Sequence, residues 1–155
     1  MASINLVEVE YVLKQTHSAS LATFHRETKM PYASLVNVAV DDEGPIILIS
    51  DLAWHTQNLI DQPQGSLLFV ETTLAETEKP QDPLGGKRVT VLGSFIHTTN
   101  KKAREFYLSM HPDANLFEGF SDFSFWRLQP KTIHAIAGFG AITTLKASEI
   151  FSPKT

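Results

Sequence analysis

The segment 46–59 (IILISDLAWHTQNL) places a strand-forming run directly before a helix-forming run, and this order constrains the fold more than any other feature. Its first four residues are apolar and mostly β-branched, which predicts a buried strand. Ser50 or Asp51 is a suitable N-cap for the amphipathic helix that we expect to begin near Ala53. The chain therefore has to pass from a sheet into a helix within a few residues.

The start of this helix is also a candidate binding site. Backbone N–H groups in the first turn of a helix have no internal partners, and they attract anions. Ser50 and Thr56 add hydroxyl groups to this corner, and His55 adds an imidazole. The segment alone is consistent with either a phosphate-binding site or an ordinary capped junction between a strand and a helix.

The remaining elements follow from apolar residues at alternating or at three- and four-residue spacing. Helices are expected over 4–16 and 101–111, with a helical turn over 147–151. Strands are expected over 18–24, 32–40, 45–50, 65–71, 87–97, 123–128 and 132–137, and one more short strand after Gly140. Residues 41–44 read as a hairpin turn and 72–86 as a loop at the rim of a site or against a subunit.

This pattern predicts a mainly β (α+β) fold. The strands are numerous, short and joined by hairpins, with helices inserted between them, so we expect an antiparallel barrel of about six strands with peripheral helices. A chain of 155 residues is long enough for one ordinary core, and residues 1–155 are expected to form a single domain.

Composition excludes several classes of function. The residues are 43% hydrophobic and only 19% charged, which is typical of a globular protein with some surface covered by a partner. A net charge of −4 without a basic stripe argues against nucleic-acid binding. The absence of cysteine excludes disulfides and thiolate sites. No apolar run is long enough to span a membrane, and the acidic N-terminus does not resemble a signal peptide, so a cytoplasmic protein is expected.

Few polar residues suggest catalysis by the chain itself. The six histidines form no H-x-x-x-H pair, no metal site is expected, and no nucleophile elbow or glycine-rich phosphate loop is present. Any chemistry would then need a bound cofactor. Arg88 lies between core residues and is expected either to pair with an acid or to hold an anion. Arg127 is expected at the surface, and His134 is expected to be packed or hydrogen-bonded within its strand.

Five segments, in order, resemble the pyridoxamine 5′-phosphate oxidase-related, FMN-binding split-barrel family, and more narrowly its haem-utilisation branch. They read SLATFHRETKMPYASLVNVAVDDEGPIILIS, SDLAWHTQNL, KRVTVLGS, AREFYLSMHPDANLF and DFSFWRLQPKTIHAIAGFG, and they cover most of residues 18–140. The resemblance implies a split β-barrel and a homodimer whose ligand site lies at the subunit interface. The RVTVLG and HPDANL segments also resemble secreted growth-control relatives that share the barrel without evident flavin chemistry.

The resemblance implies an FMN-binding flavoprotein, and a flavin-dependent oxidoreductase of an unknown small substrate. By position, it implies cofactor contacts from Ser34, Ser50, His55, Thr56 and Arg88. The oxidases use arginine and lysine near the phosphate, where this chain has Ser34, Trp54 and His55. The charge-assisted hydrogen bonds lost are worth about 1.5–3 kcal/mol each. No counterpart of the oxidases' substrate-reading arginine and histidine follows Gly140, so a true pyridoxamine 5′-phosphate oxidase is not expected.

Two alternatives remain open at this point. The first is a haem-binding or haem-utilisation protein, because Arg88 matches an arginine of those relatives. Their axial histidine lies in a C-terminal extension, whereas this chain ends at IFSPKT and its last histidine is His134, so haem would need another ligand. The second is a non-enzymatic split-barrel dimer with a degenerate pocket, in which Trp54 or Phe139 blocks the flavin volume.

Overall fold

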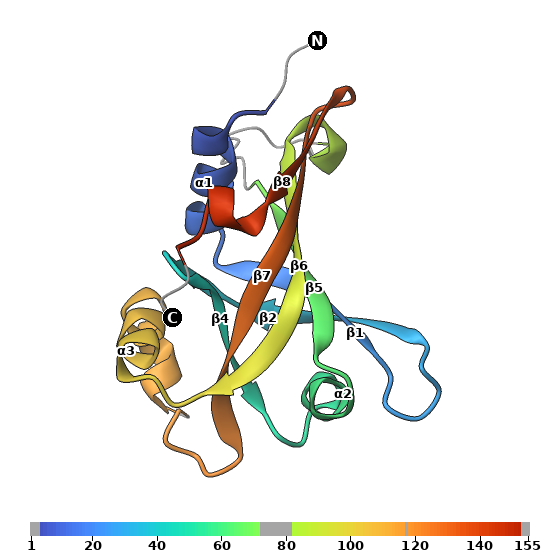
Figure 1. The fold of residues 1–155 in the computed structure, drawn as a ribbon. Coiled ribbons are helices and arrows are strands. Elements are labelled where there is room, and N and C mark those ends of the chain that lie inside the picture. The colour runs from blue at the N-terminus through green and yellow to red at the C-terminus, as the bar shows by residue number, and fades with distance from the viewer. Residues whose placement is uncertain (1–3, 72–81, 117, 153–155) are drawn as a thin grey trace.

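A single curled antiparallel sheet forms the centre of the computed structural model, which describes residues 4–71, 82–116 and 118–152 (Figure 1). Within those residues the strand order is β2-β1-β5-β6-β7-β4-β3, and β8 pairs with β7. The strands are β1 Ser18–Phe24, β2 Pro31–Asn37, β3 Ala39–Asp41, β4 Gly44–Ser50, β5 Gln64–Val70, β6 Lys87–Thr98, β7 Phe123–Ala137 and β8 Ala141–Lys146. The mainly β split barrel predicted from the sequence is confirmed. Eight strands are described, as many as the segments that were expected, and all belong to one sheet where a barrel of about six was expected.

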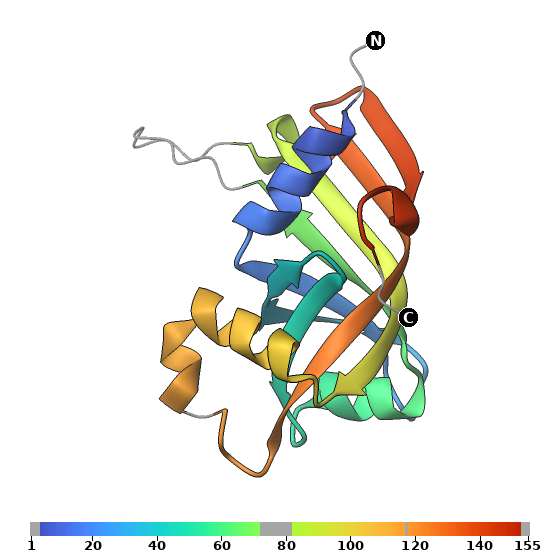
Figure 2. The same ribbon diagram turned by 60° about the vertical axis from the view of Figure 1, so that its left-hand side comes forward.

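Three α-helices lie at separate places around this sheet (Figures 1 and 2). They are α1 Leu6–Gln15, α2 Trp54–Asp61 and α3 Lys101–Met110, and short 3₁₀ turns cover Pro83–Gly85, Pro112–Leu116 and Ala147–Glu149. The α1 helix begins with a capping box between Asn5 and Glu8, which satisfies backbone groups that the first turn leaves unpaired. None of the described helices is long and apolar enough to cross a membrane.

Two apolar cores lie on opposite sides of the sheet. On the inner side of the curl, α1 packs against the strands, and Val89 and Val91 of β6 are fully buried. On the other side, α3 covers β4 and the first half of β7, where Tyr107 packs against Phe125. We use the term outer face for the surface of β1, β5, β6, β8 and the second half of β7 that lies opposite Val89 and Val91. No described helix covers it.

The predicted strand 32–40 is wrong in one respect, because the chain changes partner at Val38. Before this residue β2 pairs with β1, and after it β3 pairs with β4. The N–H of Val38 donates to the carbonyl of His17 instead of continuing a ladder. Most of β4 pairs with β7. A local hairpin pattern could not predict this exchange, because β7, the strand that pairs with most of β4, lies far along the chain.

The two strands predicted at 123–128 and 132–137 form one strand, β7. A bulge absorbs the interruption, since Leu92 faces Thr132 while Gly93 faces Pro130. A side chain at Gly93 would bring its Cβ within 2.0 Å of the Gln129 carbonyl oxygen, so only glycine fits there. The predicted loop 72–86 lies mostly outside the described residues, which resume at Asp82.

Arg127 is buried, and the prediction of a surface position is wrong. Its side chain binds Asp41 through two hydrogen bonds, of 2.7 and 2.8 Å, and also donates to the carbonyl of Gly44. The arginine therefore fastens the β3–β4 turn to β7. A carboxylate supplied from 86 positions away in the sequence lets a charged side chain remain buried.

Candidate functional site

The first candidate site lies where the edge strand β2 meets the start of α2. Ser34 Oγ lies 3.1 Å from His55 Nδ1, so the structure brings together two of the predicted cofactor contacts. The ring of Trp54 lies beside those of His25 and Tyr32, at centroid distances of 5.0 and 5.7 Å. Burial lowers the pKa of His55, so its imidazole is neutral at pH 7 and offers no fixed positive charge.

The other two predicted contacts at this corner are occupied by the protein. Ser50 Oγ donates to a carboxylate oxygen of Asp122 at 3.0 Å and accepts from the N–H of Leu52. The hydroxyl of Thr56 is buried and donates to the carbonyl of Ser50. Neither hydroxyl proton is available to a phosphate, and the carboxylates of Asp51 and Asp122 make the turn less favourable for an anion.

The predicted N-cap of α2 is also corrected. Ala53, rather than Ser50 or Asp51, occupies the N-cap position, and no side chain caps the helix. The first-turn N–H groups of α2 therefore lack side-chain partners. They are the part of the predicted anion-binding site that remains available to a ligand.

Arg88 lies far from this corner within one chain. It is the second residue of β6. The start of β6 lies at the end of the sheet beside α1 and β8, whereas α2 lies near the opposite end of the molecule (Figure 1). Ser94 lies six positions further along β6 and pairs with Gln64, which follows α2, so Arg88 is about 20 Å from that end of the strand at the usual rise per residue. A single chain therefore does not unite Arg88 with Ser34 and His55.

Arg88 has no carboxylate partner among the described residues. Its Nη2 donates to the carbonyl of Gly138 at 2.9 Å, and its Nε is buried without a hydrogen bond. Of the two roles that the sequence left open, pairing with a described acid is excluded. A guanidinium with unused donors on a sheet surface is suited to binding an anion.

The second candidate site is the outer face around Arg88. The pairing register sets its side chains in rows across the strands, with Val70, Arg88, Ile136 and Ile142 in one row and Leu68, Thr90, His134 and Thr144 in the next. Leu68, Leu92 and Ile142 are 38%, 42% and 62% exposed, so the face is apolar as well as accessible. An exposed apolar surface of this kind marks an interaction site.

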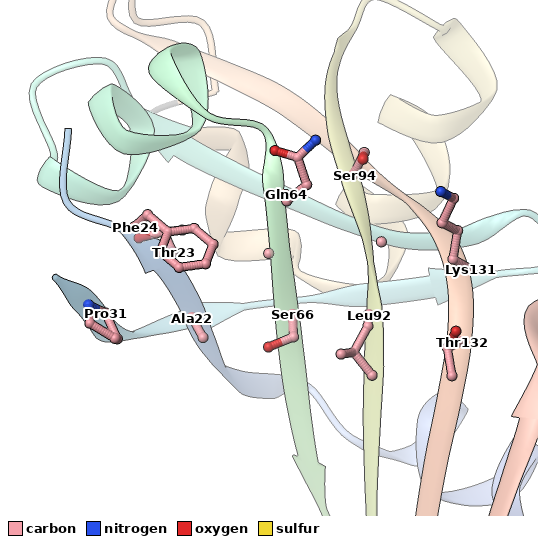
Figure 3. Close-up of a pocket in the computed structure, with 12 residues that line it drawn as sticks. Ala22, Thr23, Phe24, Pro31, Gln64, Ser66, Leu92, Ser94, Lys131 and Thr132 are labelled. Carbon is pink, nitrogen blue, oxygen red and sulfur yellow. The ribbon is translucent and has the colours of Figure 1, made fainter. Parts of the chain in front are cut away.

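A groove of about 420 Å³ continues this face toward the bulge (Figure 3). Ala22, Ser66, Leu92 and Thr132 lie side by side from four neighbouring strands, and Gln64, Ser94 and Lys131 lie together at the other end. Lys131 forms no ion pair with a described residue. The groove has the size and the mainly apolar lining, with a few polar groups, that are typical of small-molecule sites.

The sequence identified Arg88, and the expectation that His134 is packed or hydrogen-bonded within its strand is confirmed by its 3.1 Å contact with Thr144 Oγ1. The position of His134 on the outer face was not predicted, and neither was the groove. The alternation of 132–137 contained the signal for His134, because it lies between Ile133 and Ala135, which are both buried. The groove had no local signal, since its walls come from β1, β2, β5, β6 and β7. Within the described part of the chain, no three His, Asp or Glu side chains gather closely enough to hold a metal ion unaided.

Comparison with known proteins identifies the family. Residues 9–152 match the family model described as CREG, beta-barrel. The chain belongs to this family, and the predicted resemblance to split-barrel proteins of the haem-utilisation branch is confirmed.

Two relatives carry haem-related names. The chain is 34% identical over 136 residues to the chloroplastic heme oxygenase HOZ of Arabidopsis thaliana, in a match that covers 84% of this chain and 40% of that protein. It is 28% identical over 139 residues to the heme oxygenase HutZ of Vibrio cholerae, covering 86% of this chain and 76% of HutZ. This chain thus spans less than half the length of the plant relative.

Solved structures agree on the architecture. A heme binding protein from Mycobacterium smegmatis superimposes with a TM-score of 0.81 at 25% identity, over 96% of this chain and 60% of that one. A Clostridium acetobutylicum protein related to general stress protein 26, of the pyridoxinephosphate oxidase family, gives a TM-score of 0.70 over 94% and 96% of the two chains. Its 12% identity supports the shared fold alone.

Proposed function

We propose that this protein binds haem on its outer face. The observation that carries the proposal is Arg88, a cation without a described carboxylate partner on an exposed apolar sheet surface. The haem-related names of the relatives support the same ligand class. This interpretation replaces FMN as the first choice, because the hydroxyl groups of the predicted phosphate corner already have protein partners.

The residues present fit the chemistry of haem, which combines a flat apolar ring with two carboxylates and an iron. Leu68, Leu92 and Ile142 provide apolar surface on neighbouring strands. Arg88 provides a cation for the carboxylates, and it retains a buried donor without a partner. When bound, haem supplies an iron centre, on which the activity implied by the relatives' name depends.

We further propose that two copies of the chain pair through the outer face, with the ligand between them. Exposed apolar side chains on this face would be covered in such a homodimer, and the low charge of the sequence agrees. Light scattering after gel filtration tests the pairing. A particle of twice 17.2 kDa supports it, and a monomer with or without hemin contradicts it.

Hemin titration tests the proposed ligand. Wild-type protein is expected to shift and sharpen the Soret band until a binding endpoint is reached. Removal of a charge-assisted hydrogen bond worth about 1.5–3 kcal/mol should raise the Kd of R88M roughly 10- to 100-fold. R104M is the matched control, because Arg104 is an exposed arginine of α3 that pairs with Glu118. Equal affinities for the two variants would contradict the proposal.

FMN at the β2–α2 corner is the second candidate. The contact between Ser34 and His55 and the uncapped start of α2 favour it, and such a protein would be a flavin-dependent oxidoreductase of unknown substrate. Incubation with excess FMN followed by gel filtration tests it. Retained yellow colour that is lost in S34A and H55A supports FMN. If neither FMN nor hemin is retained, the third hypothesis, a non-enzymatic dimer with a degenerate pocket, is supported.

A further inference from the structure

His134 occupies the row of the outer face next to that of Arg88. It lies in β7, half-buried, between Thr90 of β6 and Thr144 of β8 in the pairing register. Its sequence neighbours Ile133 and Ala135 are fully buried on the inner side, so the alternation of the strand assigns His134 to the opposite surface. An imidazole therefore belongs to the same surface as the exposed apolar residues.

A hydrogen bond defines the orientation of this imidazole. His134 Nδ1 lies 3.1 Å from Thr144 Oγ1, and Nε2 has no hydrogen-bond partner among the described residues. The tautomer with hydrogen on Nδ1 donates to Thr144 and leaves a lone pair on Nε2. This is the usual arrangement of a metal-binding histidine, in which the second ring nitrogen donates to a neighbouring group that holds the ring in place.

His134 is also close to both parts of the proposed haem surface. Arg88 faces Ile136, which is two residues from His134 along β7, and such diagonal neighbours have Cα atoms about 7–8 Å apart. On the other side, Thr132 belongs to the groove. One flat ligand can therefore contact the apolar surface, the cation and the imidazole together.

The other five histidines, all of them described, are less suitable. Four have other positions or partners: His25 Nδ1 accepts two backbone N–H groups, His55 contacts Ser34, His111 Nε2 binds a backbone oxygen, and His97 packs against Trp126. His17 is the main competitor, because it lines a hollow at the edge of the outer face with Leu35 and Leu68. Its ring packs edge-on against that of His111.

We infer that His134 Nε2 is an axial ligand of the haem iron and that Thr144 holds its ring in position. This inference rests on the proposed haem function. The step forms one bond from the Nε2 lone pair to ferric iron and displaces the axial solvent ligand of hemin, without change of oxidation state. The inference differs from the ligation that the family resemblance implied, in which a histidine of a C-terminal extension binds iron.

Electron paramagnetic resonance and absorbance spectra of the ferric complex test the ligand. Wild-type protein with hemin is expected to give the spectrum of a nitrogen-ligated iron, and H134A is expected to lose that spectrum while still binding hemin more weakly. H17A is the matched control and should keep it. Added imidazole should restore the nitrogen-ligated spectrum in H134A, because a free imidazole can occupy the space left by the side chain.

The outcomes distinguish failure of the His134 assignment from failure of the proposed haem binding. If wild-type protein binds hemin and H134A gives an unchanged spectrum, or if H17A loses it instead, His134 is not the ligand and haem binding stands. If wild-type protein does not bind hemin, both fail. H134Q is a second variant in case H134A does not fold, since its amide can still bond Thr144. T144V should weaken hemin binding about tenfold, as loss of such a supporting contact usually does.

Discussion

The ion pair between Arg127 and Asp41 allows a quantitative test of how the sheet is held together. The side chains of Arg127 and Asp41 are 11% and 19% exposed, and both carboxylate oxygens accept hydrogen bonds from the guanidinium. Burial alone would raise the pKa of Asp41. The hydrogen bond and charge of Arg127, helped by the N–H groups of Glu43 and Gly44, outweigh burial and lower that pKa below its ordinary value of 3.8.

The substitution D41N removes the charge and preserves the shape of the side chain. Removal of one partner from a buried pair costs about 3–5 kcal/mol, and the partial exposure of Asp41 places our expectation near the lower limit, at about 3 kcal/mol. Since unfolding in urea has a slope of about 1–3 kcal/mol per molar, the midpoint should fall by roughly 1–3 M. Circular dichroism during urea titration measures this shift.

The control is the neighbouring variant D42N. The Asp42 side chain is 87% exposed and its contact with Lys14 is a surface ion pair, so we expect the variant's free energy of unfolding to change by no more than about 0.5 kcal/mol.

The pH dependence of stability gives a second test. Because the folded pKa of Asp41 lies below the unfolded value, wild-type stability includes a contribution that is present above pH 3.8 and is lost as the pH falls through the folded pKa. D41N should lack this loss. If D41N and D42N have equal midpoints, the reasoning is refuted.

Three further predictions concern other parts of the sheet. G93V should fail to fold, or its free energy of unfolding should fall by several kcal/mol, because its Cβ would overlap the Gln129 carbonyl. The yield of folded protein measures this. F69A should destabilise the fully buried inner core by about 3–5 kcal/mol in urea titration, and a cost below 1 kcal/mol would contradict the packing. His55 has a pKa lowered by burial, so it should contribute stability above pH 6.5 that is lost as the pH falls further. H55Q should flatten that part of the pH profile, and an unchanged profile would contradict the assignment.

The sequence predicted elements well where the pattern was local. The strand 18–24 has the same bounds in the structure as in the prediction, because alternate residues such as Ala19 and Leu21 face one core. The α3 helix begins at Lys101, as the sequence predicted, and Asn100 is its N-cap. Predictions failed where a distant partner decided the outcome. The exchange of partner at Val38 and the burial of Arg127 both depend on contacts that no short window contains.

For the candidate sites too, the predictions failed where a residue distant in the sequence contributed. The contact between Ser34 and His55 spans 21 residues and was expected only through the family resemblance. The carboxylate of Asp122, 72 positions from Ser50, reaches the predicted phosphate corner and changes its charge, which the pattern of residues 46–59 could not indicate. Arg88 was identified because a charged residue inside an apolar alternation is rare and can be seen in the sequence alone.

Nuclear magnetic resonance of isotope-labelled protein with ferric hemin tests the location of the ligand most directly, because the paramagnetic iron broadens the amide signals nearest to it. Haem on the outer face predicts selective loss of the signals of Leu68, Thr90 and Thr132, while those of Ser34 and Thr56 persist. Broadening centred on Ser34 and Thr56, or equal signals with and without hemin, would contradict the account.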